Sequence, residues 1–153
     1  MPKFVFKLQP VLDLREREEQ EKKRILADLE RQGLSLESRI RQFQHNIENE
    51  QASLASMLTD KNGVDLKGAR LQANAALSNR FAAQRTVLEL AGVHKLINDA
   101  RAQLTEASAR RKAVELLKDR QREAFESEQR RRESLELDDM SVMRHSRRDG
   151  ALL

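Results

Sequence analysis

The chain has 153 residues with no cysteine, tryptophan or tyrosine, and only two prolines, five glycines and five phenylalanines. Without cysteine, neither a disulfide framework nor a thiolate metal site can form. With so few aromatic side chains, a globular core would lack large apolar groups to bury. No apolar run approaches the roughly 18 residues of a membrane-spanning helix, and Lys7 and Pro10 interrupt the apolar N-terminus, unlike a signal peptide. We therefore expect a soluble, intracellular protein that meets a membrane only through a partner.

Charged and helix-forming residues are abundant instead. Charged side chains make up 35% of the chain, alongside many Ala, Leu and Gln residues that favour helices. So much charge is also typical of disordered chains. The aliphatic residues recur at regular intervals, however, which favours long amphipathic helices over disorder.

A seven-residue spacing of apolar side chains is the strongest pattern, and it is typical of the a and d positions of a coiled coil. It is well occupied over residues 26–57, lacks apolar residues over 15–24, and resumes over 90–114. Beyond this range, Leu116 and Leu117 suggest a shift of phase, as a stutter would produce. The first-half series are Leu8, Arg15, Lys22, Leu29, Leu36, Phe43, Glu50, Met57 and Leu12, Glu19, Leu26, Gly33, Ile40, Ile47, Leu54. The second-half series are Leu90, Ile97, Leu104 and Val93, Ala100, Ala107, Val114.

The segment Asp60-Lys61-Asn62-Gly63 is the clearest helix breaker, and Asp65 can cap a following helix. Two long helices with a short connection pack antiparallel, because each covers the apolar stripe of the other. We therefore predict an all-α fold in which two long helices form an antiparallel coiled-coil hairpin with both termini at one end. The predicted bounds are helix 1 at 5–59, a loop at 60–66 and helix 2 at 67–138 within a hairpin domain of residues 1–140, followed by a flexible basic tail at 141–153.

The charged strip over residues 15–24 separates the apolar N-terminus from the rest of the first helix. Ion pairs at four-residue spacing each add about 0.2–0.5 kcal/mol to a helix, whereas a buried leucine gives about 1.5–3 kcal/mol. We therefore expect the strip to be helical but weakly paired with the second helix. Its acidic residues would face a basic cluster consisting of Arg110, Arg111 and Lys112.

Phe4, Phe6 and Leu8 have few possible partners in such a hairpin. The available apolar side chains of the second helix are Phe125, Leu135 and Leu137. Two interpretations stay open: the residues close the hairpin in a small cluster, or they dock into a partner protein. Both hold if the partner grips the closed end.

No set of residues suited to catalysis or to metal binding is present. His45, His94 and His145 are dispersed, without the carboxylate spacing of a metal-binding helix, and there is no glycine-rich phosphate loop. We expect a protein that is not an enzyme and has no cofactor, with His45 and His94 on solvated faces.

The net charge of +4 raises nucleic-acid binding as an alternative function. Basic runs lie at residues 130–132 and 144–148, but Glu128 and Glu133 flank the first run and no aromatic residue is available nearby for base stacking. A solvated helix face explains these runs more simply, so we expect no nucleic-acid partner. A generic coiled coil that self-associates along its seam is a further alternative, whereas a self-sufficient hairpin would be a monomer.

Both ends of the chain resemble the FliJ family, the small coiled-coil component of the bacterial flagellar type III protein export apparatus. The N-terminal pattern is carried by Phe4, Phe6, Leu8, Val11, Leu12, Arg15 and Glu18. The C-terminal pattern is carried by Arg111, Lys112, Leu137, Asp138, Asp139 and Arg144. The length, the absence of cysteine and the central break agree with the family, and the resemblance spans the whole chain.

The resemblance implies a role in flagellum biogenesis, and so in motility and chemotaxis. Family members resemble the central stalk of rotary ATPases: the end with both termini enters the ring of the export ATPase (FliI). They also contact the export gate protein (FlhA) and handle substrate chaperones, at the cytoplasmic side of the inner membrane. The residues implied in the ATPase-ring contact are Phe4, Phe6, Leu8, Val11, Leu12, Arg15, Glu18, Leu137, Asp138 and Asp139.

For the export gate, the resemblance implies exposed apolar residues near the start of the second helix. Leu71, Leu77 and Phe81 stand there, in an alanine-rich region that matches the family only loosely. The alternative is that these three residues continue the seam of the hairpin.

Overall fold

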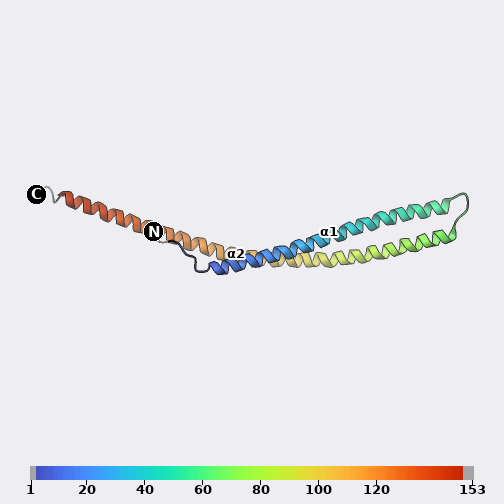
Figure 1. Cartoon of the computed structure of the whole chain (residues 1–153), viewed down its shortest axis with the longest axis horizontal. Helices are drawn as coiled ribbons and strands as arrows, with labels where there is room; N and C mark the ends of the chain where they lie inside the picture. Colours follow the sequence, from blue (N-terminus) through green and yellow to red (C-terminus); the bar gives the residue numbers. More distant parts are fainter. Residues whose placement is uncertain (1–2, 150–153) are drawn as a thin grey trace. The chain divides into compact units, whose positions relative to one another are not determined.

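The structure is a computed structural model that describes residues 3–149, with the side chains of residues 3–144. In the described residues the regular structure is helical: α1 spans Gln9–Thr59 and α2 spans Leu66–Asp149 (Figure 1). The chain divides into two units, each described by itself. The turn unit contains residues 20–105, and the terminal unit contains residues 3–19 together with 106–149.

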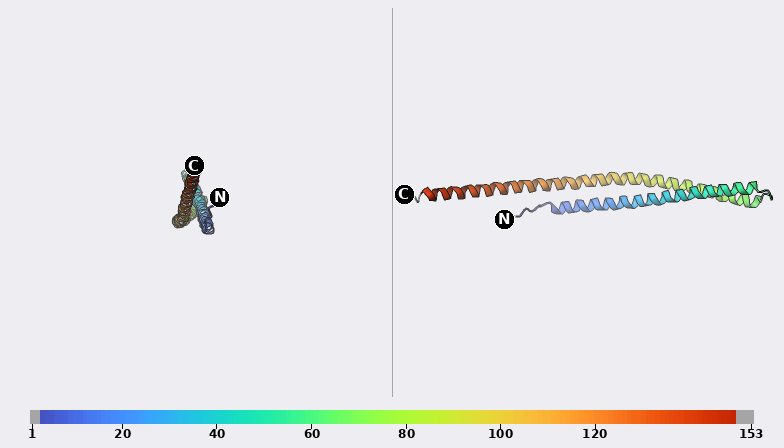
Figure 2. Two further views of the ribbon diagram at one scale, coloured as in Figure 1. Left: turned by 90° about the vertical axis from the view of Figure 1, so that its left-hand side faces the viewer. Right: turned by 90° about the horizontal axis from the view of Figure 1, so that it is seen from above.

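In the turn unit, α1 and α2 run antiparallel and side by side, as both views of the ribbon show (Figures 1 and 2). The predicted series faces inward: every series position of α1 from Leu26 to Leu54 is buried or half-buried, and so are the α2 positions from Leu90 to Leu104. The prediction of an all-α fold with two long, mutually packed helices is therefore confirmed. The seam also continues toward the turn with smaller residues, namely Ala69, Ala76, Ala83 and Thr86.

The turn between the helices is built by two aspartates and one glycine. The backbone N–H of Asn62 donates to Asp60 Oδ1 over 3.1 Å, which tightens the start of the turn. Gly63 has a φ of 112°, a conformation that side-chain-bearing residues rarely adopt. Asp65 caps α2, because its Oδ1 accepts the backbone N–H groups of residues 67 and 68, each at 3.1 Å. The loop thus spans residues 60–65.

In the terminal unit, α1 begins at Gln9, later than the predicted residue 5. Pro10 explains the difference, because it has no N–H to donate to the carbonyl of residue 6 and its ring would clash there. The segment before Gln9 is not helical, and it instead packs against α2. The Phe4 and Phe125 rings lie 5.8 Å apart, and Phe6 is buried.

The seam of the terminal unit contradicts the predicted stutter. Leu116 and Leu117 are exposed, whereas Arg111, Lys118 and Phe125, at unbroken seven-residue spacing, are half-buried. Long basic side chains can occupy such positions because their aliphatic stems pack while their charged ends reach water. The helix phase is therefore continuous from Leu90 to Phe125.

The final part of α2 continues to Asp149, beyond the predicted end at 138. The sequence between Gly92 and Gly150 contains no glycine or proline that would end a helix. All residues from 130 to 144 are exposed, so the side chains of this helix segment are open to solvent along its length. The predicted flexible tail is helical as far as Asp149, and residues 150–153 lie outside the described residues.

Candidate interaction surfaces

The residues predicted to contact an ATPase ring fall into two groups in the terminal unit. Phe6 and Leu12 are only 6% and 4% exposed and form the core of the unit. Phe4 is half-buried on Phe125, as the closing-cluster interpretation expects. Lys118 completes this cluster: its Nζ lies 5.9 Å from the centre of the Phe6 ring and donates to the Gln9 side chain over 2.8 Å. We call Phe4, Phe6, Phe125 and Lys118 the closing cluster. These residues hold the N-terminal segment to α2.

The remaining predicted residues are accessible. Leu8 and Val11 are partly exposed, and Arg15 forms an ion pair of 2.8 Å with Glu18. The other three, in the last part of α2, are Leu137, Asp138 and Asp139, and all three are exposed. A partner could therefore contact these side chains without unfolding the closing cluster.

A buried carboxylate links the two helices of the terminal unit. Glu19 is 6% exposed; its Oε2 lies 2.5 Å from Arg111 Nε and its Oε1 accepts the Ser108 hydroxyl at 2.8 Å. Partial burial acts to lower the pKa of Arg111, but the hydrogen bond and charge of Glu19, followed by Glu115, outweigh it and raise this pKa. The expected pairing of the charged strip with the basic cluster is thus made by Arg111, whereas Arg110 pairs with Glu106 on its own helix.

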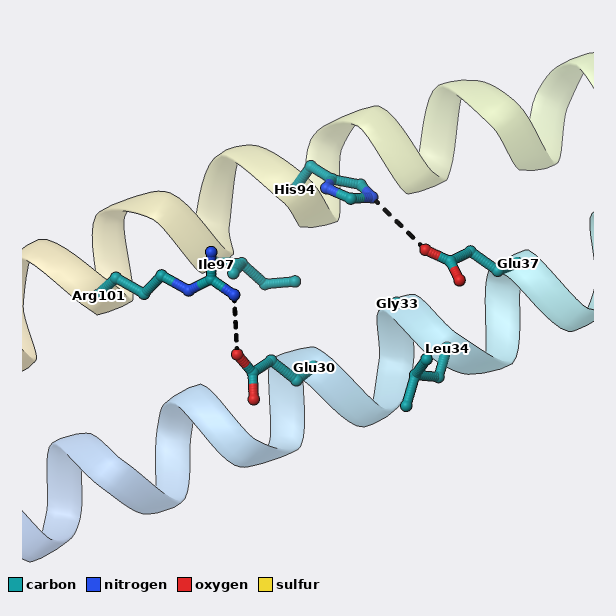
Figure 3. A pocket seen from close by; sticks show the side chains of 7 residues that line it. All are labelled: Glu30, Gly33, Leu34, Glu37, His94, Ile97 and Arg101. Carbon is teal, nitrogen blue, oxygen red and sulfur yellow. Dashed lines mark hydrogen bonds and ion pairs between the residues drawn. The ribbon is translucent and has the colours of Figure 1, made fainter.

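In the turn unit, one ion pair and one histidine–carboxylate contact bridge the helices beside the seam (Figure 3). Arg101 Nη2 lies 3.0 Å from Glu30 Oε1, and His94 Nε2 lies 4.0 Å from Glu37 Oε1. Between them is a shallow groove of about 280 Å³, lined also by Gly33, Leu34 and Ile97. No cluster of three or more potential metal ligands occurs among the described residues.

Leu77 and Phe81 lie on the face of α2 opposite the seam, so the alternative that they continue the seam is wrong. They are 51% and 59% exposed. Leu88, which the sequence analysis did not single out, extends the same line and is 73% exposed. Its position seven residues after Phe81 was the available signal. We call Leu77, Phe81 and Leu88 the outer stripe. Leu71 is also exposed but lies about a third of a turn away around α2.

A second groove runs beside the outer stripe, between the two helices. Its volume is about 470 Å³, and it is lined by Ile40, Gln44, Ala83, Gln84, Val87 and Leu88. Leu88 therefore belongs to both the groove and the stripe, so the two surfaces adjoin at this residue on the turn unit. We call this groove the stripe groove.

The basic run at 130–132 is engaged within its own helix, because Arg131 and Arg132 both pair with Glu128, at 3.3 and 3.2 Å. His45 and His94 are exposed, as predicted. No helix in the part of the chain that the structure describes is long and apolar enough to cross a bilayer.

Comparison with known proteins gives one finding on the family. The family model for the flagellar FliJ protein matches residues 4–150. No curated protein and no solved structure matches the chain significantly. The family match includes the outer stripe, the closing cluster and the exposed part of α2.

Proposed function

Because the chain belongs to the FliJ family, we propose that it acts as a stalk in the ring of the flagellar export ATPase and links this ring to the export gate. Family membership makes the chain a non-catalytic component of the flagellar export machinery. We further propose that its partners are FliI and FlhA and that it escorts substrate chaperones. In this proposal the chain is held at the cytoplasmic side of the inner membrane by its partners alone.

For the ATPase contact, we assign the direct role to accessible residues of the terminal unit. Leu137, Asp138 and Asp139 are accessible to a surrounding ring, because every residue from 130 to 144 is exposed. Leu8 and Val11 offer smaller apolar contacts. Phe4, Phe6 and Leu12 act indirectly by keeping the N-terminal segment on α2.

For the gate contact, we assign Leu77 and Phe81, with Leu71 nearby. The observation that carries this assignment is that large apolar side chains occupy the outward face of α2, where a coiled coil normally places polar residues. Exposed leucine and phenylalanine side chains that serve no internal packing are suited to bind a partner protein.

The decisive experiment compares two variants for binding to the cytoplasmic domain of FlhA. The double variant Leu77→Ala/Phe81→Ala should bind at least about tenfold more weakly, because truncating central apolar contacts costs more than about 1 kcal/mol each. Leu96→Ala is the matched control, because Leu96 is as exposed as Leu77 but is not part of the stripe. Equal binding by both variants would contradict the gate assignment. Circular dichroism should show unchanged helicity in both.

A separate variant addresses the ATPase contact. Leu137→Ala/Asp138→Ala/Asp139→Ala should weaken binding to FliI, yet leave both FlhA binding and helical content unchanged, because these residues pack against nothing in the described chain. Unchanged FliI affinity would exclude this part of α2 from the ring contact.

A further inference from the structure

We propose that the outer stripe and the stripe groove together bind an acidic amphipathic helix of the partner protein. This inference rests on the proposed gate contact and adds the chemistry of the segment that occupies it.

The shape of the surface suits a helix. Leu77, Phe81 and Leu88 follow one line along α2 over about 17 Å, which is about three helical turns. The stripe groove adjoins the Leu88 end of this line, where it is lined by Val87 and Leu88 of α2 and by Ile40 of α1. A second helix lying along this line could place side chains three and four residues apart into the groove, in the usual way that helices pack.

The charge of the surface selects an acidic partner. Residues 66–88 include Lys67, Arg70, Arg80 and Arg85 but no aspartate or glutamate. By helical geometry, Arg80 and Arg85 lie on either side of Phe81 around α2. No ion pair involves either arginine within the described side chains. The nearest acidic residue after the stripe, Glu89, is directed to Arg39 instead, at 3.9 Å.

These features favour a protein helix over the other possible occupants. A second copy of the chain would bring the same unpaired arginines together, and like charges at an interface are unfavourable. A membrane surface would contact the projecting stripe but would leave the side chains of Ile40 and Ala83 in the shallow stripe groove uncovered. An acidic helix satisfies the arginines and fills the groove with apolar side chains.

The test is a binding measurement with the full chain and the cytoplasmic domain of FlhA at low and high salt. Arg80→Glu/Arg85→Glu should weaken binding about tenfold at low salt, and this difference should shrink toward about 1 M salt, where charges are screened. Arg24→Glu/Arg31→Glu, on exposed positions of α1 in the same unit, carries the same charge change and should bind like the parent. Hydrogen exchange on the FlhA domain should identify a protected helix that carries aspartate or glutamate beside apolar residues.

The outcomes separate this inference from the proposed function. If Leu77→Ala/Phe81→Ala weakens binding while charge reversal and salt have no effect, the gate contact stands and the acidic helix is wrong. A protected segment that is basic or not helical also overturns the inference. If the parent chain does not bind the FlhA domain, the gate contact and the inference both fail. Flotation of the chain with anionic vesicles, or dimers lost on Leu88→Ala in sedimentation, would assign the surface to a lipid or to a second copy and overturn the inference.

Discussion

The side chains that lie between α1 and α2 differ in kind between the two units. In the turn unit the seam is mainly aliphatic, with Ile97 and Ala100 buried. Glu50, half-buried at a series position, is an exception and accepts a hydrogen bond from Asn79. In the terminal unit Glu19, which belongs to the α1 series of Leu12 and Leu26, pairs with Arg111, which continues the α2 series of Leu90, Ile97 and Leu104 by seven residues. Apolar burial adds net stability, whereas a buried ion pair often adds little beyond the cost of removing its charges from water. Aliphatic packing therefore dominates in the turn unit, whereas in the terminal unit an ion pair shares the interface with the buried side chains of Phe6 and Leu12.

The largest effect is expected from an apolar deletion in the turn unit. Ile97→Ala should lower the free energy of unfolding by about 2–4 kcal/mol, because it removes a buried side chain from the aliphatic seam. Urea denaturation followed by circular dichroism measures this change. Leu96→Ala, next to it but exposed, should stay within about 0.5 kcal/mol of the parent. Equal losses of stability in the two variants would show that the burial of Ile97 does not stabilise the fold.

The next effect concerns the ionic seam of the terminal unit. Arg111→Leu alone should increase amide hydrogen exchange over residues 9–19, because it leaves the Glu19 carboxylate buried without its main partner. The double variant Glu19→Leu/Arg111→Leu should restore or exceed the parent's protection, because two apolar groups replace the pair. A double variant that is as unprotected as the single one would mean that the ion pair itself stabilises the unit.

The smallest effect is expected at Gly33, which lies in the seam of the turn unit. Gly33→Ala should raise the free energy of unfolding by about 1 kcal/mol through helix propensity. The added Cβ would lie 3.5 Å from Ile97 Cδ1 and 3.9 Å from Val93 Cγ1, which is ordinary contact. Gly92→Ala is the control, because its Cβ would meet nothing within 4 Å and reports propensity alone. A lower stability for Gly33→Ala than for Gly92→Ala would show that the seam tolerates no side chain there.

The sequence predicted the seam well where apolar residues mark it and poorly where charged residues occupy it. Leu26 to Leu54 face inward as the spacing requires. Leu116 and Leu117 misled the prediction, because a leucine pair resembles a shifted seam when the true positions carry Arg111 and Lys118. A periodicity read from hydrophobicity alone cannot register a lysine or arginine whose stem packs inward.

The candidate surfaces show a similar division. The sequence placed Phe4, Phe6 and Leu12 among possible partner contacts, but the structure buries Phe6 and Leu12 within the chain. It also left Leu77 and Phe81 between seam and surface, and only their exposure on the outer face of α2 decided this. Leu88, Arg80 and Arg85 could be assigned to this surface only when the structure showed which face of α2 is exposed.

By itself, the sequence determined that this chain forms two long helices joined at an Asn-Gly turn, because helix-forming residues, seven-residue spacing and the breaker are local properties. The position of Pro10 also decided where α1 can begin. Only the packing of one helix on the other decided which charged residues enter the seam and which apolar ones stay outside. The burial of a side chain depends on its distance to the neighbouring helix, and the order of residues along the chain does not specify that distance.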